Sequence, residues 1–168
     1  MTDKHDTLSR RNFISGLALA AVALIFTART AVAEVLRKLN MSEEEWRQRL
    51  TPEQFRILRK EGTERSNTSP LDKEKRPGIY HCAGCDLPLF TSEMKFDSGT
   101  GWPSFYDVLP EHVETKTDYK LLWPRTEYHC ARCGGHQGHV FKDGPQPTGL
   151  RYCNNGVALR FQPTGEAA

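Results

Sequence analysis

The sequence predicts a single, mainly β domain with short helices near its start. After Gly78 the apolar stretches are short and are separated by glycine and proline, as in antiparallel strands. Before that point, from Ser42 to Lys60, the apolar residues recur at helical spacing. Strand and helix patterns do not alternate afterwards, so a parallel α/β sheet is not expected. The length of 168 residues suits about one domain.

Residues 1–33 are predicted to be an export signal that precedes this domain. A basic start ends at Arg10 and Arg11, an apolar run extends from Phe13 to Phe26, and small residues close the segment. This order of features indicates a cleavable secretory signal. The apolar run is short for a helix that must cross about 30 Å of hydrocarbon, so a retained membrane anchor is the less favoured alternative.

The stretch Ser9–Ile14 carries the paired arginines followed by Phe and Ile, and it closely resembles the twin-arginine signal, whose pathway moves folded proteins. We therefore expect the twin-arginine export machinery as a partner, cleavage after about Ala33, a linker at residues 34–41, and a periplasmic domain at residues 42–165. A domain that folds around a metal in the reducing cytoplasm avoids losing its thiols to disulfides.

The positive net charge does not indicate a nucleic-acid partner. The chain has a net charge of +2, but residues 1–33 hold four of its 23 Lys and Arg residues and two of its 21 Asp and Glu residues, which leaves 19 of each sign. A neutral domain exerts no general attraction on phosphate backbones. No nucleic acid is therefore expected among the partners.

The sequence after the linker predicts two helices. Ser42 and Glu45 fit a capping box, and Thr51 followed by proline marks the start of the second helix. We expect these helices to lie over the domain as a lid, with Trp46 and Phe55 in the core.

The polar segment from Gly62 to Gly78 predicts a solvated surface connection, because it is rich in Ser, Asn, Pro and mixed charges. Strands are predicted after it. The stretches concerned are Ile79–His81, Leu87–Phe90, Glu127–His129, His139–Phe141 and Val157–Phe161.

Four of the five cysteines form two Cys-x-x-Cys pairs, and these predict a metal site. The pairs are Cys82 with Cys85 and Cys130 with Cys133. Each pair is a tight turn that directs two thiolates at one ion, and two such turns complete a tetrahedron. One zinc ion per chain is the first choice, iron in a rubredoxin-like site uses similar ligands, and two structural disulfides are the alternative in an exported protein. Four thiolates leave no open coordination position, so the ion is expected to be structural.

The fifth cysteine, Cys153, is a candidate nucleophile. A lone cysteine is by default a small buried apolar residue. Here Arg151 can favour the thiolate electrostatically, and Asn155 is expected on the same side of a strand. Upstream, His136 and His139 follow the second cysteine pair, where a metal site would hold them rigidly, and imidazoles can act as acids near neutral pH.

Several motifs in order now resemble one family, methionine sulfoxide reductase B. The motifs are Gly101–Phe105, Gly135–Phe141, Asp143–Pro145, Pro147–Cys153 and both cysteine pairs. The resemblance covers about residues 42–163. The resemblance implies a small fold of two antiparallel sheets and a peptide-methionine (R)-S-oxide reductase, which repairs oxidised proteins. Its partners would be oxidised proteins or peptides that contain methionine-R-sulfoxide, and a thioredoxin-like or other thiol reductant.

The resemblance also implies roles for site residues. The cysteine matching Cys153 attacks the sulfoxide sulfur and becomes a sulfenic acid, and the tryptophan matching Trp102 surrounds the substrate methyl group. The residues matching His139 and Asn155 bind the substrate and protonate its oxygen. His136 either lines the pocket or supports His139.

The chain departs from the family pattern at two positions. Many members carry a resolving cysteine where this chain has Thr100, so the sulfenic acid must be reduced by an external thiol. Gln137 occupies a position that is usually aliphatic in the family. Two other classes of function remain open: a zinc-ribbon-like interaction module in which Cys153 is packing, and a thiol-disulfide oxidoreductase that uses the cysteine pairs as redox dithiols.

Overall fold

The computed structural model describes residues 37–120 and 123–165. The export signal predicted at residues 1–33, and the alternative of a membrane anchor there, lie outside the described residues. Within the described part, no helix has the length and apolar character needed to cross a membrane.

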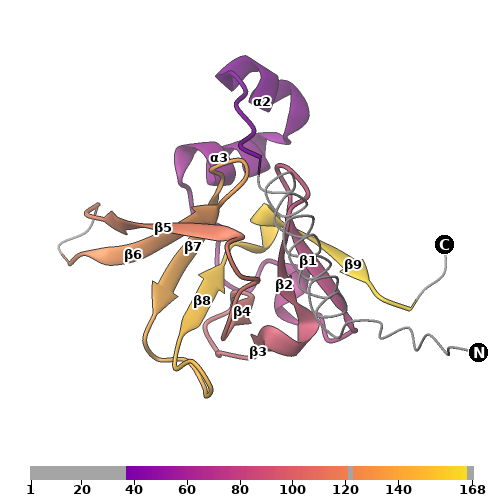
Figure 1. Ribbon diagram of the computed structural model, residues 1–168, viewed down its shortest axis with the longest axis vertical. Helices are drawn as coiled ribbons and strands as arrows, with labels where there is room; N and C mark the ends of the chain where they lie inside the picture. Colours follow the sequence, from indigo (N-terminus) through magenta and orange to yellow (C-terminus); the bar gives the residue numbers. More distant parts are fainter. Residues whose placement is uncertain (1–36, 121–122, 166–168) are drawn as a thin grey trace, which may run out of the picture. The chain divides into compact units, whose positions relative to one another are not determined.

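Two antiparallel sheets make up most of the fold, which confirms the predicted fold class (Figure 1). The smaller sheet has the strand order β2-β1-β9, and the larger has the order β3-β4-β8-β7-β6-β5. The strands are β1 Gly78–Cys82, β2 Pro88–Thr91, β3 Lys95–Phe96, β4 Ser104–Phe105, β5 Val113–Asp118, β6 Arg125–Cys130, β7 His136–Phe141, β8 Arg151–Asn154 and β9 Leu159–Pro163.

The two predicted helices are α2 (Glu43–Arg49) and α3 (Pro52–Lys60), and both begin as their sequences indicate. Ser42 and Glu45 form a reciprocal capping box, and Thr51 forms one with Gln54. Each box satisfies backbone N–H groups that a helix start otherwise leaves without partners. Trp46 and Phe55 are buried, as expected.

An aromatic cluster fills the core between the two sheets. Tyr80 and Phe90 come from the small sheet, and Phe105 and Tyr128 come from the large one. The rings of Phe90 and Phe105 stack with centroids 4.0 Å apart, and Tyr80 meets Phe105 edge-on at 4.9 Å. Such pairs contribute about 0.5–1.5 kcal/mol beyond burial of their area, so the cluster fixes how the sheets face each other.

Two details of the predicted elements are wrong. Most of the Gly62–Gly78 segment is exposed, but it contains the 3-10 helix η1 (Pro70–Asp72), and the side chain of Glu64 is buried with 4% exposure. In the last predicted strand, Val157 and Ala158 belong to the 3-10 helix η3 (Gly156–Ala158), and β9 begins after them. The strand β5 was not predicted, because its sequence Val-Glu-Thr-Lys-Thr-Asp is almost entirely polar and exposed.

Candidate active site and metal centre

Strand pairing sets the surroundings of Cys153 in the large sheet. Cys153 lies in β8, opposite His139 of β7 on one side and Ser104 of β4 on the other. Directly opposed residues of antiparallel strands project from the same face, with Cβ atoms about 4.5–5.5 Å apart. The thiol of Cys153 and the imidazole of His139 are therefore neighbours on one face of the sheet.

Two glycines of the family motifs allow the chain to approach this closely. A Cβ atom on Gly138 would lie 1.9 Å from the carbonyl oxygen of Cys153, so β7 and β8 can pair here only without a side chain. Gly101 has a φ of 83°, and a Cβ atom there would lie 2.7 Å from the Asn67 side chain. These glycines fix the positions of Cys153 and of Trp102, which follows Gly101.

A cavity of about 150 Å³ lies over Cys153, and we call it the Cys153 cavity. Its size is similar to that of apolar cavities that accept one benzene-sized molecule. The lining includes four residues singled out in the sequence and several that were not: Trp102, His139, Cys153 and Asn155, with Thr63, Arg125, Gly138, Phe141 and Asn154. Among the described residues that line it, His136 does not occur.

The environment of Cys153 favours the protonated thiol. Burial raises the pKa of the thiol, and this outweighs the opposing effects of the Arg151 charge and of a hydrogen bond from the Thr100 side chain. Arg151 is itself bound by Asp143 through two hydrogen bonds of 2.8 Å, which offsets part of its charge. The predicted influence of Arg151 therefore has the expected sign but does not decide the protonation state.

His139 is held by a carboxylate that the sequence analysis did not identify. The ring Nε2 lies 2.8 Å from Oδ2 of Asp118, and the same carboxylate accepts a hydrogen bond of 2.6 Å from Arg125. A hydrogen bond from the Lys120 backbone N–H and the one from His139 keep the pKa of Asp118 well below its usual value. An ionised carboxylate only accepts hydrogen bonds, so Nε2 of His139 carries the proton.

His136 lies behind His139 in a second buried network. Its Nδ1 donates to Oε1 of Glu127 over 2.7 Å, and the other oxygen of Glu127 lies 3.3 Å from Nζ of Lys116. Burial lowers the pKa of His136 although Glu127 opposes this, so the ring is neutral at pH 7. The rings of His136 and His139 meet edge-on at 5.6 Å, and His136 thus contacts His139 from beneath the cavity wall.

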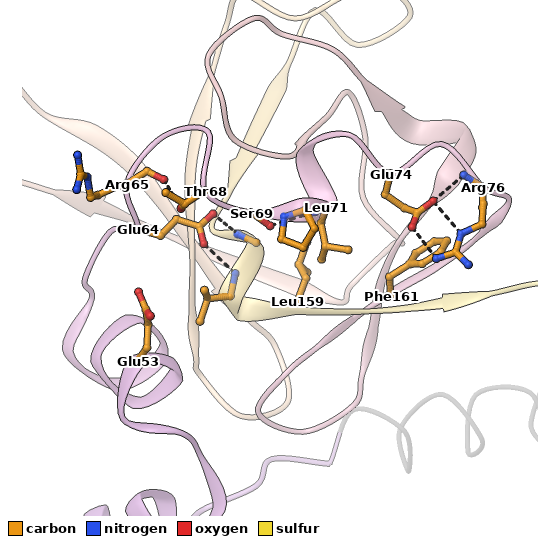
Figure 2. Close-up of a pocket in the computed structure, with 13 residues that line it drawn as sticks. Glu53, Glu64, Arg65, Thr68, Ser69, Leu71, Glu74, Arg76, Leu159 and Phe161 are labelled. Carbon is orange, nitrogen blue, oxygen red and sulfur yellow. Dashed lines mark hydrogen bonds and ion pairs between the residues drawn. The ribbon is translucent and has the colours of Figure 1, made fainter.

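Glu64, from the segment that was expected to be a plain connection, holds two walls of the cavity. Its carbonyl oxygen accepts a hydrogen bond of 3.2 Å from the Trp102 indole N–H, and its backbone N–H donates to Oδ1 of Asn155 over 3.0 Å. Its carboxylate accepts the backbone N–H groups of Gly156 and Val157, at 2.6 and 3.0 Å (Figure 2). The residue therefore joins Trp102 to the turn that follows Cys153.

Asn155 is also engaged by the backbone on its other side. Its Nδ2 donates to the carbonyl oxygen of Gln137 over 2.9 Å. One N–H of this amide group remains for a ligand, since the nitrogen has two hydrogens. The turn at Asn155 places its side chain at the cavity wall, although Asn155 follows β8 instead of belonging to the strand as expected.

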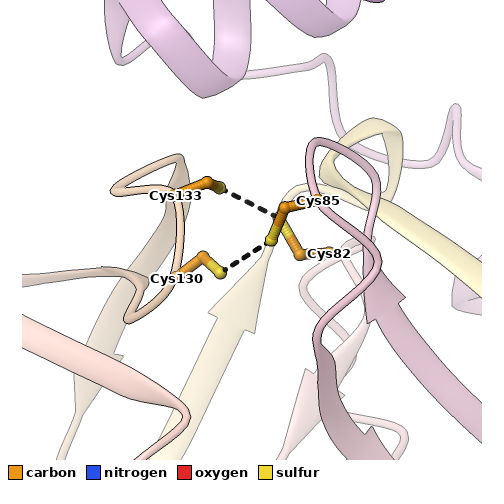
Figure 3. A group of neighbouring side chains, drawn as sticks. All are labelled: Cys82, Cys85, Cys130 and Cys133. Carbon is orange, nitrogen blue, oxygen red and sulfur yellow. Dashed lines mark hydrogen bonds between the residues drawn. The ribbon is translucent and has the colours of Figure 1, made fainter. Parts of the chain in front are cut away.

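The two Cys-x-x-Cys turns meet and form a four-cysteine centre (Figure 3). Cys82 and Cys85 lie at the end of β1 in the small sheet, and Cys130 and Cys133 lie at the end of β6 in the large sheet. Their sulfur atoms all lie within 4.8 Å of one another, and all four residues are buried. This cluster can hold a metal ion, and such an ion would tie the two sheets together.

The sulfur distances distinguish a metal site from disulfides. Sγ of Cys82 lies 3.6 Å from Sγ of Cys133, and Sγ of Cys85 lies 3.4 Å from Sγ of Cys130, so the four residues are free thiols. A disulfide requires about 2.05 Å. Tetrahedral thiolates at about 2.3 Å from zinc lie roughly 3.8 Å apart, which is close to the observed spacing.

Gln137 reaches this centre from β7. It is fully buried, and its Nε2 lies 3.4 Å from Sγ of Cys82. An N–H directed at a thiolate sulfur favours the negative charge that a metal ligand carries. Gln137, which stands where the family usually has an aliphatic residue, therefore contacts the four-cysteine centre through its side chain.

Comparisons with known proteins match most of the described chain. The SelR domain family matches residues 50–163. The peptide methionine sulfoxide reductase MsrB of Agrobacterium fabrum is 54% identical over 127 residues, which cover 75% of this chain and 94% of that protein. The MsrB of Leifsonia xyli is 56% identical over 127 residues, covering 74% and 91%.

Plant relatives match over a smaller part of their length. The chloroplastic peptide methionine sulfoxide reductase B1 of Arabidopsis thaliana is 54% identical over 123 residues, which cover 73% of this chain and 61% of that protein. The chain spans 59% of the corresponding rice protein. The matched region is therefore about three fifths of these longer relatives.

Proposed function

The chain belongs to the SelR family, that of the methionine sulfoxide reductases B, and from this membership we propose that it reduces methionine-R-sulfoxide, mainly in peptides, to methionine. The proposal rests on the Cys153 cavity. The thiol of Cys153, the indole of Trp102 and the imidazole of His139, which is hydrogen-bonded to a carboxylate, all line this one cavity. Sulfoxide reduction needs a soft nucleophile and a proton source at the departing oxygen. The cavity contains both.

In the proposed reaction, the sulfur of Cys153 attacks the substrate sulfur while a proton reaches the sulfoxide oxygen. The sulfur–oxygen bond and the transient bond between the two sulfurs then break, while the hydroxyl group forms a bond to Sγ of Cys153, which becomes a sulfenic acid. The substrate sulfur gains two electrons and becomes a thioether. One thiol and one sulfoxide thus give one sulfenic acid and one thioether, and the proton that the oxygen gains is the one that the thiol loses, passed on directly or through the ring of His139.

The cavity walls assign a position to each part of the substrate. The indole of Trp102 gives the methyl group an apolar surface, while His139, held by Asp118, lies on the side of the oxygen. The free N–H of Asn155 can bind the same oxygen. Because methyl and oxygen meet different walls, one sulfoxide epimer fits better than the other.

Regeneration of Cys153 uses an external thiol reductant, such as a thioredoxin-like protein. Thr100 occupies the position next to the thiol, as its hydrogen bond to Cys153 supports. One external thiol attacks the sulfenic acid, forming a mixed disulfide and releasing water, and a second thiol then releases Cys153 and a disulfide.

The four-cysteine centre is proposed to hold one structural zinc ion per chain. The donor set and the sulfur spacing fit a tetrahedral thiolate site. When bound, the ion supplies no reaction step and joins the small sheet to the large one. Metal analysis of the purified protein tests this, because zinc gives a colourless protein at one ion per chain, whereas iron in the same site absorbs visible light.

We further propose that residues 1–33 are a twin-arginine signal and that the domain acts in the periplasm on oxidised proteins. The support is the sequence Ser9–Ile14 and the small residues that end at Ala33. Replacement of Arg10 and Arg11 by lysine should leave the tagged protein in the cytoplasm. Export that survives this change would contradict the proposal.

Single-turnover reduction of peptides that contain each sulfoxide epimer tests the activity and its nucleophile together. The unchanged domain, without added reductant, should convert about one methionine sulfoxide to methionine per chain, in the R peptide only. Cys153→Ser should convert none while still holding its metal. Protein that holds its metal but gives no product from either epimer would favour an interaction module instead.

A further inference from the structure

Two aromatic side chains at the tip of the β5–β6 hairpin have no place in the packing described above. Tyr119 is 76% exposed and Trp123 is 80% exposed, and they are the large hydrophobic side chains that lie exposed in the described part of the chain. Single exposed apolar residues are common on protein surfaces. Tyr119 and Trp123 both lie in the short connection between β5 and β6, and aromatic residues are enriched where proteins bind other chains.

The strand ends next to this tip contribute to the Cys153 cavity and its surroundings. Arg125, the first residue of β6, lines the cavity, and it lies two positions after Trp123. Asp118, the last residue of β5, accepts hydrogen bonds from Arg125, from His139 and, over 2.9 Å, from the Lys120 backbone N–H. The same carboxylate therefore orients the cavity wall and the start of the aromatic tip.

The hairpin is also fastened to the end of helix α3. Lys116 and Lys120 both pair with Glu61, the C-cap residue that follows α3. These ion pairs lower the pKa of Glu61 to about 2 and offset the lysine charges locally. Tyr119 and Trp123 therefore adjoin strand ends that are held by Asp118 and by the ion pairs with Glu61.

We propose that Tyr119 and Trp123 form a docking surface for the polypeptide chain that carries the methionine sulfoxide. This inference rests on the proposed function and names the form of substrate that the cavity takes best: an extended segment with apolar residues close to the oxidised methionine. An extended chain advances about 3.3 Å per residue. A peptide whose sulfoxide enters the cavity beside Arg125 thus brings its nearest neighbours alongside Trp123.

The experiment compares three substrates in the R configuration. The first is N-acetyl-methionine sulfoxide, the second is a peptide with leucine and phenylalanine beside the sulfoxide, and the third is the same peptide with serine and glycine there. Each is assayed with the unchanged protein, with Tyr119→Ser/Trp123→Ser, with Trp123→Phe, and with Lys73→Ser, whose side chain is 72% exposed in another part of the surface.

For the apolar peptide, Tyr119→Ser/Trp123→Ser should lower kcat/KM about tenfold, mostly through a higher KM, because truncated aromatic contacts at binding surfaces typically have effects of this size. Its kcat/KM for N-acetyl-methionine sulfoxide should stay within about twofold of the unchanged protein. Trp123→Phe should keep most of the kcat/KM of the unchanged protein, since a phenyl ring keeps the apolar contact. Lys73→Ser should have no effect on kcat/KM.

Equal losses for all three substrates would overturn the docking surface, because the hairpin would then act only on the cavity itself. No loss for the apolar peptide would overturn it as well. If the unchanged protein reduced none of the three substrates, the proposed function would fail, and the docking surface with it. These outcomes separate the two claims.

Discussion

The four-cysteine centre takes its side chains from two turns, whereas the Cys153 cavity takes its walls from five separate stretches of chain. In the first, four identical groups are arranged by two copies of a short motif. In the second, Trp102 and Asn155 depend on Glu64, and His139 depends on Asp118. Loss of one ligand should therefore abolish the centre as a unit, whereas changes around the cavity should act in graded steps.

The largest effect is expected at the four-cysteine centre. Cys82→Ser should give protein without metal and without a cooperative thermal transition, because structural zinc binding contributes about 10–16 kcal/mol against a total stability of about 5–15 kcal/mol. Metal content and circular dichroism melting measure this. Cys153→Ser is the matched control, and it should keep both metal and melting temperature. A folded, active Cys82→Ser protein would show that the sheets do not need the ion.

A smaller, graded effect is expected from Glu64→Gln. An amide nitrogen would face a backbone N–H at η3, so the free energy of unfolding should fall by about 2 kcal/mol. The backbone bonds of Glu64 to Trp102 and Asn155 remain, but the turn that follows Asn155 loses part of its side-chain anchor, so the KM for peptide sulfoxide should rise. Denaturant unfolding and steady-state kinetics test this. Asp72→Asn changes another buried carboxylate of the same segment and should leave KM unchanged. The same KM increase in both variants would contradict a specific role for Glu64.

Thr100→Cys tests whether the cavity lacks only one side chain for internal recycling. The Thr100 side chain hydrogen-bonds Cys153, so a cysteine there should form a disulfide with Cys153 after one turnover. Mass spectrometry should find this disulfide. Without reductant, the amount of methionine formed per chain should remain about one. Persistence of the sulfenic acid in the variant would mean that the two sulfur atoms cannot meet.

The smallest effect concerns the protonation of Cys153. Because burial raises the pKa of this thiol, the thiolate fraction at pH 7 should be below that of free cysteine, whose pKa is about 8.5. The rate at which iodoacetamide labels Cys153 can be followed by mass spectrometry. This rate should still increase with pH over the range in which the labelling rate of glutathione no longer changes. Arg151→Met removes a cation that lowers this pKa, so its labelling at pH 8 should be slower. A plateau below pH 8 would contradict the raised pKa.

Local features of the fold were predictable from the sequence. The capping boxes of α2 and α3 need only neighbouring residues, and so do the two cysteine pairs. The cavity was predictable only in part. Cys153, His139 and Asn155 were singled out by residue type and spacing, and Trp102 through the family resemblance. The structure places all four at one cavity, while their roles remain predictions.

The supporting residues could not be predicted, because their contacts join distant parts of the chain. Glu64 bonds to Asn155 across 91 residues, and nothing near Glu64 in the sequence distinguishes it from other polar loop residues. Asp118 and Arg125 could have been noticed in the sequence only weakly, as two opposite charges on either side of a short apolar stretch. The polar pattern of β5 hid the hairpin to which they belong.

The contrast between the two kinds of sulfur site has a consequence for how each site would withstand oxidants. The four-cysteine centre excludes solvent by burial, while the less buried Cys153 rests as a protonated thiol. Peroxides react with thiolates that they can reach. The resting protein thus has two separate defences against inactivation, and when Cys153 is oxidised, the product is the same sulfenic acid that the proposed reaction forms and an external thiol reverses.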